Sequence, residues 1–247
     1  MTTANTARFN AEAAAWDSNP GVLLASALAS DAILSRLGRP DPLPDVLELG
    51  CGTGLLSLSL APHVRSLTAV DAAEGMVAAL RAKLAADGGL GGHSNVRAVC
   101  ALLEDPDDAR IREDPVAPEG QGEELPLPPR RFDLVVSHLM LHHVPDLAPL
   151  LRTMIGCLRV GGRVALTDYE DFGPAARRFH PEAKMDGVER HGVRGADMEA
   201  LLRGAGFVDV VVETAFEMDK AVETEPGSGV LGPTMTFPFL ICLGRRP

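Results

Sequence analysis

The sequence predicts an α/β fold in which a mainly parallel sheet carries helices on both faces. Two observations lead to this prediction. From residue 45 onward short apolar runs alternate with segments of helical periodicity, and a glycine-rich turn follows the first of these runs. Strands that alternate with helices form parallel sheets, because two parallel strands can only be joined by a long crossover. The chain has 247 residues, 46% of them hydrophobic, which suffices for one domain of this kind.

Each element follows from its own pattern. The apolar runs indicate strands at Asp45–Leu49, Leu67–Val70, Val96–Cys100, Phe132–Ser137, Arg163–Thr167 and Val208–Val212. Apolar residues spaced three or four apart indicate helices at Leu55–Leu60, Glu74–Ala86, Leu147–Leu158 and Ala196–Ala205. A last strand, Thr236–Leu243, follows a stretch rich in Gly and Pro without a helical pattern. We therefore expect this strand to form an antiparallel hairpin with the one before it.

The predicted organisation is a single globular unit. Residues 1–40 have a helical pattern and are expected to form an N-terminal cap over the carboxyl edge of the sheet. Residues 41–247 form the main domain. Residues 105–130, rich in Pro, Asp and Glu and without periodicity, are expected to be a solvated insertion between the third and fourth strands.

Composition excludes several classes of partner. The net charge of −11 argues against a nucleic-acid partner, because binding to a phosphate backbone needs clustered Lys and Arg. The N-terminus lacks the apolar core of a signal peptide, and no apolar run is expected to reach bilayer-spanning length. The four cysteines have no CxxC spacing, which predicts free thiols, no metal site and a cytoplasmic protein. No feature predicts the oligomeric state.

The glycine-rich stretch VLELGCGTGLLSLSL, residues 46–60, points to a ligand. Gly50, Gly52 and Gly54 leave the first strand, and without a Cβ they let the backbone bend sharply and be approached closely. In an open parallel sheet ligands bind beyond the carboxyl ends of the strands, where the strand order reverses. Asp71 ends the second strand, where its carboxylate can accept both hydroxyls of a ribose. The combination predicts a ligand that contains adenosine.

The spacing of the glycines argues against a dinucleotide. In the fingerprint G-x-G-x-x-G/A the last position packs a helix beside the pyrophosphate, but here Leu55 or Ser57 stands in that place. Glu48, ahead of the glycines, would repel a pyrophosphate and suits a cationic amine or sulfonium.

Four blocks of sequence carry a family resemblance. They are ELGCGTG (48–54), AVDAAEGMV (69–77), FDLVVSHLMLHHVPDL (132–147) and LRVGGRVALTDYE (158–170). Together and in this order they resemble the class I S-adenosylmethionine-dependent methyltransferases, in particular the small-molecule branch typified by ubiquinone and menaquinone biosynthesis enzymes. The resemblance covers about residues 45–206. It implies a Rossmann-like seven-stranded sheet with six parallel strands and an antiparallel last strand.

The same resemblance implies S-adenosyl-L-methionine as cofactor and S-adenosyl-L-homocysteine as product. It places the turn after the first strand at the methionine end, Asp71 on the ribose, and the residues after the third strand, to Glu104, around the adenine. The implied cofactor-binding residues are Glu48, Gly50, Cys51, Gly52, Gly54, Asp71, Ala72, Met76, Leu102, Leu103 and Ser137.

The catalytic candidates follow from the chemistry of methyl transfer. The reaction is an in-line displacement at an activated carbon, so the protein supplies alignment and, where the acceptor must lose a proton, a base. His138, Tyr169 and His191 are the catalytic candidates, and His142 and His143 are alternatives that can equally serve the structure. Residues expected on the substrate side or in a lid are Trp16, His142, Phe172 and His180.

Missing motifs narrow the acceptor. The fourth strand is followed by SHLM and not by the [DN]-P-P-[YF] of adenine amino-methyltransferases, no Pro-Cys nucleophile is present, and no acidic magnesium motif follows. We therefore predict metal-independent methylation of an O, N, S or C atom in a small molecule. The alternatives are a protein or tRNA methyltransferase and a non-catalytic partner subunit that binds S-adenosylmethionine.

Overall fold

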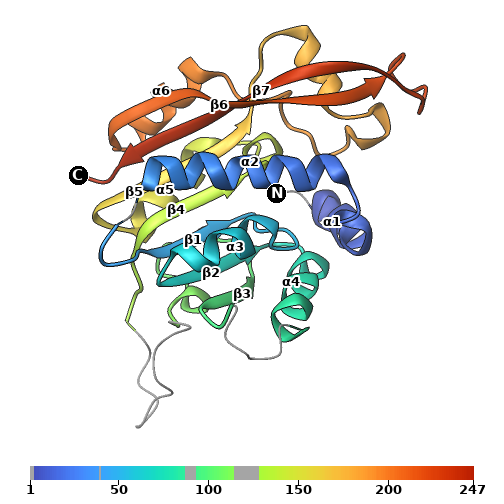
Figure 1. Cartoon of the computed structure of the whole chain (residues 1–247). Helices are drawn as coiled ribbons and strands as arrows, with labels where there is room; N and C mark the ends of the chain where they lie inside the picture. Colours follow the sequence, from blue (N-terminus) through green and yellow to red (C-terminus); the bar gives the residue numbers. More distant parts are fainter. Residues whose placement is uncertain (1–2, 39, 87–92, 114–127) are drawn as a thin grey trace.

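A seven-stranded sheet forms the centre of the computed structural model, which describes residues 3–38, 40–86, 93–113 and 128–247. The strand order is β3-β2-β1-β4-β5-β7-β6 (Figure 1). The strands are β1 (Asp45–Leu49), β2 (Ser66–Asp71), β3 (Val96–Cys100), β4 (Phe132–His138), β5 (Leu158–Tyr169), β6 (Val208–Glu223) and β7 (Leu231–Arg245). β1 to β5 pair in parallel, and β7 runs antiparallel to both β5 and β6. The predicted fold class is confirmed.

The strand order reverses between β1 and β4. From β1 the chain proceeds outward through β2 to β3, and it then returns to place β4 on the other side of β1. The carboxyl ends of β1 and β4 therefore diverge into crossovers on opposite faces, which leaves a crevice above them.

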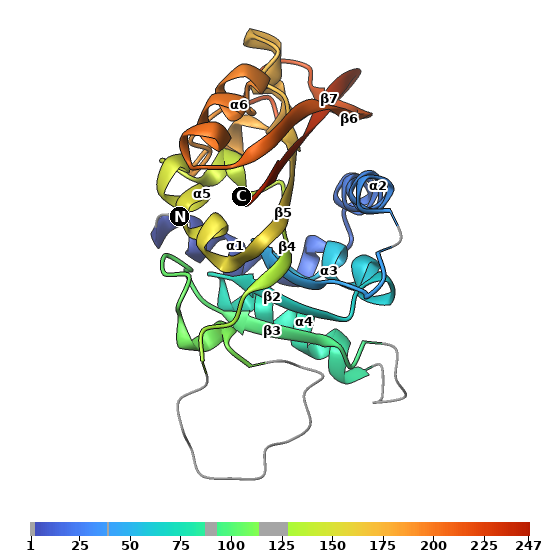
Figure 2. The ribbon, with the colours of Figure 1, turned by 90° about the vertical axis from the view of Figure 1, so that its left-hand side faces the viewer.

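Helices cover both faces of the sheet, as Figure 2 shows. Their bounds are α1 (Thr3–Trp16), α2 (Pro20–Leu37), α3 (Leu55–Leu60), α4 (Glu74–Ala86), α5 (Leu147–Cys157) and α6 (Gly195–Gly204). Ile33 of α2, Leu56 of α3 and Leu80 of α4 pack in one buried cluster with β1 and β2. Leu151 of α5 and Leu202 of α6 belong to a second cluster on the other face. The predicted helices α3 to α6 are present, and the side chain of Asp146 caps α5, accepting from the amide of Ala148 at 3.0 Å.

The N-terminal cap consists of two helices with different neighbours. α1 packs beside α4, and α2 packs along α3 and β6 (Figure 1). α2 also corrects one expectation, since by length and composition this one helix is long and apolar enough to cross a membrane. Its residues Ala25, Ala29 and Ile33 are buried within the domain, whereas Leu23 and Leu24 are exposed.

The last two strands are much longer than predicted. β6 has 16 residues and β7 has 15, so their outer halves continue beyond the partner strand β5. The outer halves pack over the crossover that follows β5, where Met218 and Val222 join Phe179 and Phe237 in a third buried cluster.

The predicted insertion is anchored at both described ends. Residues 109–111 form a short 3₁₀ turn whose Ile111 is fully buried, and Arg130 is buried just before β4. Residues 114–127 lie outside the described part of the chain.

Candidate active site

The three glycines after β1 serve two different purposes. All three have positive φ, at 76°, 53° and 84° for Gly50, Gly52 and Gly54. A Cβ on Gly50 would stand 2.6 Å from Met140 Cγ, and one on Gly54 would stand 2.3 Å from Leu80 Cδ1. These two glycines are therefore required by packing. A Cβ on Gly52 would meet nothing within 4 Å. Gly52 thus presents bare backbone to an open space, which suits close approach by a ligand.

Asp71 links this turn to the end of β2. Its carboxylate accepts from the Gly52 amide at 2.9 Å and from the Ala73 amide at 2.8 Å. Burial raises the pKa of Asp71, while these amides act in the opposite direction. A carboxylate has about four lone-pair sites, so two remain for hydroxyls of a ligand.

Glu48 lies fully buried at the end of β1. The hydroxyl of Ser57 donates to its Oε2 at 2.5 Å. Burial raises the pKa of Glu48 to about 8, and the nearby charge of Asp71 acts in the same direction. Burial also raises the pKa of the Cys51 thiol, which keeps this thiol neutral. An acidic group that is held protonated here can ionise when a cation binds beside it.

The remaining cofactor candidates divide into accessible and buried side chains. Ala72 is half-buried, and Met76 packs with Phe9 of α1. Leu102 is 46% exposed beyond the end of β3, whereas Leu103 is buried in the core cluster beneath α5. Of the two leucines, Leu102 is the one whose side chain is available to a ligand.

The end of β4 carries two buried polar atoms without partners among the described residues, Ser137 Oγ and His138 Nε2. His138 Nδ1 lies 2.9 Å from the hydroxyl of Thr167, and that hydroxyl donates to the Ser137 carbonyl at 3.3 Å. In the tautomer that carries its proton on Nδ1, His138 donates to this hydroxyl and the lone pair lies on Nε2. Burial lowers the pKa of His138 to about 4, so the ring is neutral near pH 7.

His142 forms a buried pair with Asp168, a residue that the sequence prediction missed. Its Nδ1 lies 2.8 and 3.0 Å from the two carboxylate oxygens, and its Nε2 is buried without a partner in the described chain. Burial alone would raise the pKa of Asp168, but the His142 ring and amide outweigh it, so the pKa is lowered. The sequence could have indicated this pair. Asp168 lies at the carboxyl end of β5, and β5 is the neighbour of β4, so the carboxyl ends of the two parallel strands lie side by side.

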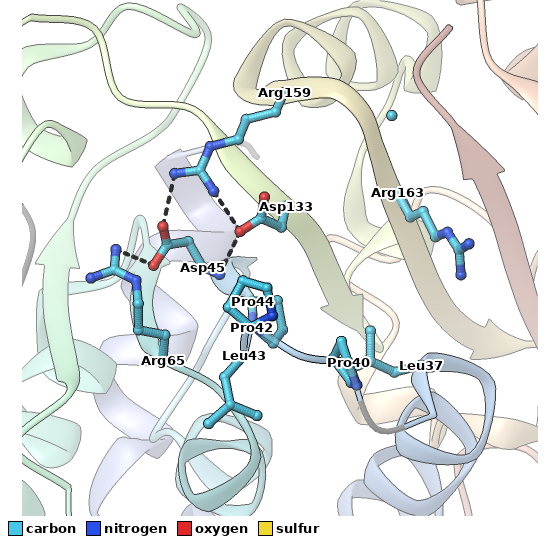
Figure 3. A pocket seen from close by; sticks show the side chains of 11 residues that line it. Leu37, Pro40, Pro42, Leu43, Pro44, Asp45, Arg65, Asp133, Arg159 and Arg163 are labelled. Atoms are coloured by element: carbon cyan, nitrogen blue, oxygen red, sulfur yellow. Dashed lines mark hydrogen bonds and ion pairs between the residues drawn. The ribbon is translucent and has the colours of Figure 1, made fainter.

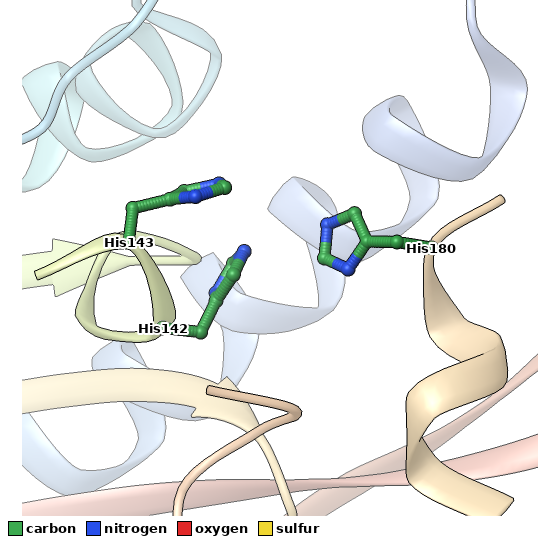
Figure 4. A group of neighbouring side chains, drawn as sticks. All are labelled: His142, His143 and His180. Carbon is green, nitrogen blue, oxygen red and sulfur yellow. The ribbon is translucent and has the colours of Figure 1, made fainter. Parts of the chain in front are cut away.

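His142 belongs to a group of three histidines from two segments. His142 and His143 lie on a 3₁₀ turn after β4, and His180 follows another 3₁₀ turn, residues 174–179, in the crossover after β5. The three side chains point toward one another (Figure 4). His143 Nδ1 donates to the Gly187 carbonyl at 2.8 Å. Tyr169 stacks on Phe179 beside them, and its hydroxyl lies 3.4 Å from His180 Nδ1. Burial raises the pKa of Tyr169, so its hydroxyl stays protonated.

The other predicted site residues lie around this group. His191 is half-buried, with Nδ1 enclosed and without a partner among the described residues. Phe172 is 41% exposed and packs edge-on against Phe237. Trp16 is half-buried at the end of α1, edge-on to Phe9, and Phe9 in turn meets the ring of His143 at 5.2 Å between centroids.

Side-chain hydrogen bonds hold helix α1 against three segments that surround the crevice. Thr53 of the glycine turn donates to Asp17 at 2.5 Å, just after the helix. Asn10 accepts from the Gly75 amide at 2.7 Å, and Arg8 donates to the carbonyl of Lys184 at 2.9 Å. These contacts connect α1 to the glycine turn, to the start of α4 and to the crossover after β5, so α1 covers the crevice.

A hollow also lies at the opposite edge of the sheet. It has a volume of about 700 Å³ and is lined by the amino ends of β1 and β5 together with Pro40, Pro42 and Pro44. Figure 3 shows that Asp45 stands there between Arg65 and Arg159. Both of its carboxylates, Asp45 and Asp133, are already paired with arginines, so we assign the chemistry to the crevice and not to this hollow.

Comparisons with known proteins agree with this geometry. A family model described as a methyltransferase domain matches residues 24–212. An uncharacterised methyltransferase of Schizosaccharomyces pombe is 28% identical over 152 residues, which are 60% of this chain and 47% of the relative. The ubiquinone biosynthesis O-methyltransferase of Pseudomonas aeruginosa PAO1 is 30% identical over 122 residues, 49% of this chain and 43% of the relative. The chain thus spans less than half the length of these relatives.

Solved structures share the fold. A complex of DhpI with S-adenosylhomocysteine superposes with a TM-score of 0.61 at 22% identity, covering 98% of this chain and 94% of that one. Phosphoethanolamine N-methyltransferase 2 of Haemonchus contortus, in complex with S-adenosyl-L-methionine, gives 0.59 at 15% identity over 88% of this chain and 52% of that one. With the matched family model, the strand order and the glycine turn, the chain belongs to the class I S-adenosylmethionine-dependent methyltransferases.

Proposed function

We propose that this chain transfers a methyl group from S-adenosyl-L-methionine to an O, N, S or C atom of a small molecule. The observation that carries the proposal is the open face of Gly52, joined through its amide to Asp71, beside the buried histidines that follow β4. When bound, S-adenosylmethionine supplies a methyl carbon attached to a positively charged sulfur. An electron pair of the acceptor forms the new bond to this carbon, and the electrons of the broken carbon–sulfur bond stay on the sulfur of S-adenosylhomocysteine.

The protein's own residues would hold the cofactor at three points. The bare backbone at Gly52 lies against it, Asp71 accepts the ribose hydroxyls with its free lone pairs, and Glu48 stands beneath the positively charged methionine end. Leu102, exposed beyond β3, is available to pack on the adenine. The residues present fit the cofactor in size, polarity and charge.

We assign the acceptor to the space between the end of β4, α1 and the crossover after β5. In the tautomer protonated on Nδ1, His138 has a lone pair on the unpartnered Nε2 at the end of β4, and this atom can take a proton from the acceptor. Phe9, Phe179 and the histidine rings supply an apolar and aromatic wall. Because α1 covers this space, a small molecule suits it better than a folded protein or tRNA. The acidic composition and the free cysteines support a cytoplasmic enzyme without a nucleic-acid partner.

A matched pair of glycine variants tests cofactor binding. Gly52→Val fills the open space before the turn, whereas Gly161→Val places the same side chain at another positive φ with nothing within 4 Å, at the amino end of β5. Calorimetry with S-adenosylmethionine and S-adenosylhomocysteine should show no measurable binding for Gly52→Val and wild-type affinity for Gly161→Val. Equal affinities in the two folded variants would place the cofactor elsewhere.

Labelled cofactor and fractionated metabolite extract test the transfer itself. Radioactive methyl groups should appear in a small-molecule fraction with the wild-type protein, and the fraction then identifies the acceptor. His138→Ala should lower the turnover rate by about 10²–10⁴-fold while leaving cofactor affinity unchanged. Tight cofactor binding without transfer to metabolite, protein or tRNA would indicate a non-catalytic subunit instead.

A further inference from the structure

The three histidines beside the acceptor space bring one ring nitrogen each close together. His143 Nδ1 donates to a carbonyl oxygen, which can only accept, so its lone pair is on Nε2. His142 Nδ1 faces both oxygens of the Asp168 carboxylate, which can only accept, and its Nε2 has no partner among the described residues. One nitrogen from each of the three rings lies within 4.8 Å of the others.

The surroundings resemble those of metal ligands in proteins. A histidine that binds a metal usually donates its other N–H to a carboxylate or a backbone carbonyl, which orients the ring and makes it more basic. His142 and His143 show one of each. His142 is 1% exposed and its Nε2 has no partner in the described chain, a cost that an ion would remove. Burial lowers the pKa of His143 to about 3, so its lone pair is free near pH 7.

The geometry needs only a small adjustment to hold an ion. Nitrogens bound at about 2.1 Å to a tetrahedral ion are roughly 3.4 Å apart. The three candidate nitrogens lie within 4.8 Å of one another, so each pair has at most about 1.4 Å to close. His180 lies on the crossover after β5, between two short 3₁₀ turns, so it is the ligand whose approach would close the site.

We propose that His142, His143 and His180 bind one divalent transition-metal ion of the zinc class, whose open fourth position takes an oxygen or sulfur atom of the methyl acceptor. Three protein ligands with one open position are typical of catalytic zinc sites, whereas structural sites have four. Imidazole ligands favour zinc, cobalt, nickel and copper over magnesium or calcium. This proposal replaces the expectation from sequence that no metal takes part. The statement that the ion binds the methyl acceptor rests on the proposed function.

Metal binding is tested without any need for activity. Tag-free protein is dialysed against a chelator and titrated with Zn²⁺ by calorimetry and with Co²⁺ by visible spectroscopy. We expect one ion per chain and the intense bands of four-coordinate Co²⁺. His143→Ala and His180→Ala should weaken binding by at least roughly 100-fold, and His63→Ala, which removes an exposed histidine on the turn after α3, should leave it unchanged. Absence of saturable binding, or equal loss in all three variants, would overturn the site.

The open position is tested with a simple thiol. Adding 2-mercaptoethanol to the one-to-one Co²⁺ protein should produce a thiolate-to-cobalt charge-transfer band as the thiol loses its proton to the buffer. An unchanged spectrum would show that the fourth position is not accessible to an acceptor. The affinity for S-adenosylmethionine is measured on the same samples. A protein that binds the metal but not S-adenosylmethionine would refute the proposed function. A protein that binds S-adenosylmethionine but not the metal would refute the metal site. If His142→Ala lowers turnover in a protein that binds no metal, His142 acts as a base instead.

Discussion

Glu48 shows how one buried residue can report ligand binding. Its carboxyl group is enclosed at the end of β1, and burial raises its pKa from 4.5 to about 8. The group is therefore mostly protonated near pH 7 when no cation faces it. A positively charged sulfonium and ammonium beside it would favour the ionised form.

The same shift makes the stability of the ligand-free protein depend on pH. Between about pH 4.5 and pH 8 the folded protein holds a proton at Glu48 that the unfolded chain has lost, so the free energy of unfolding falls as pH rises through this window. Glu48→Gln should remove that slope, with a difference on the order of a few kcal/mol across the window. Urea unfolding at a series of pH values measures it. Glu217→Gln, which changes an exposed residue of β6, is the control and should keep the wild-type slope. Parallel curves for wild type and Glu48→Gln would show that Glu48 is ionised.

At the scale of elements, α1 acts as a cover held by apolar packing and by side-chain hydrogen bonds. Thr53 in the glycine turn donates to Asp17, and this bond joins the end of α1 to the cofactor loop. Thr53→Val keeps the shape of the side chain and removes the donor, so it should loosen α1 and weaken cofactor binding by about 0.5–1.5 kcal/mol.

Hydrogen exchange of residues 3–16 measures the loosening of α1 directly. Faster exchange in Thr53→Val than in wild type is expected, with Ser18→Ala as control, since the Ser18 hydroxyl bonds only to the Ala15 carbonyl at the exposed end of the same helix. If exchange and cofactor affinity are both unchanged, the bond to Asp17 does not hold the cover in place.

The elements differ in how well the sequence predicts them. β1 and β4 lie inside the sheet with largely buried residues and contain apolar runs, so they agree with prediction within one residue, as does the short edge strand β3. The outer half of β6 alternates residues such as Glu217 and Asp219 with apolar ones and pairs only with β7. Such an edge strand has no apolar run, and its length was therefore missed.

The cofactor side of the site was also more predictable than the acceptor side. The glycine turn and Asp71 are local features of consecutive elements, so spacing alone identifies them. The histidine group joins a turn after β4 to a crossover more than thirty residues later in the chain. That contact depends on the position of His180 in a segment without periodicity, which no local pattern specifies.

On the scale of the whole molecule, the sheet separates chemistry from stability. The carboxyl edge carries the glycine turn and the histidines. The amino edge carries a charge network around Asp45, which is 2% exposed (Figure 3). Asp45 accepts from Ser66 at 2.6 Å and from Arg159 at 2.8 Å, and it also pairs with Arg65. Burial would raise the pKa of Asp45, but these donors outweigh it and lower the pKa to about 2.

This separation predicts that Asp45→Asn weakens the fold and spares the site. Removing the charge should lower the free energy of unfolding by about 2 kcal/mol at pH 7, because charge-assisted hydrogen bonds from two arginines are lost. Since the folded pKa lies below the usual 3.8, the contribution is complete above about pH 4 and disappears as pH falls toward 2. Urea unfolding should therefore show wild type and Asp45→Asn converging over that interval.

Asp209→Asn, which changes the exposed pair with Arg245, should alter stability by less than about 0.5 kcal/mol. Affinity for S-adenosylmethionine should stay at the wild-type value in both variants, and a loss in Asp45→Asn would mean that the two edges of the sheet are coupled.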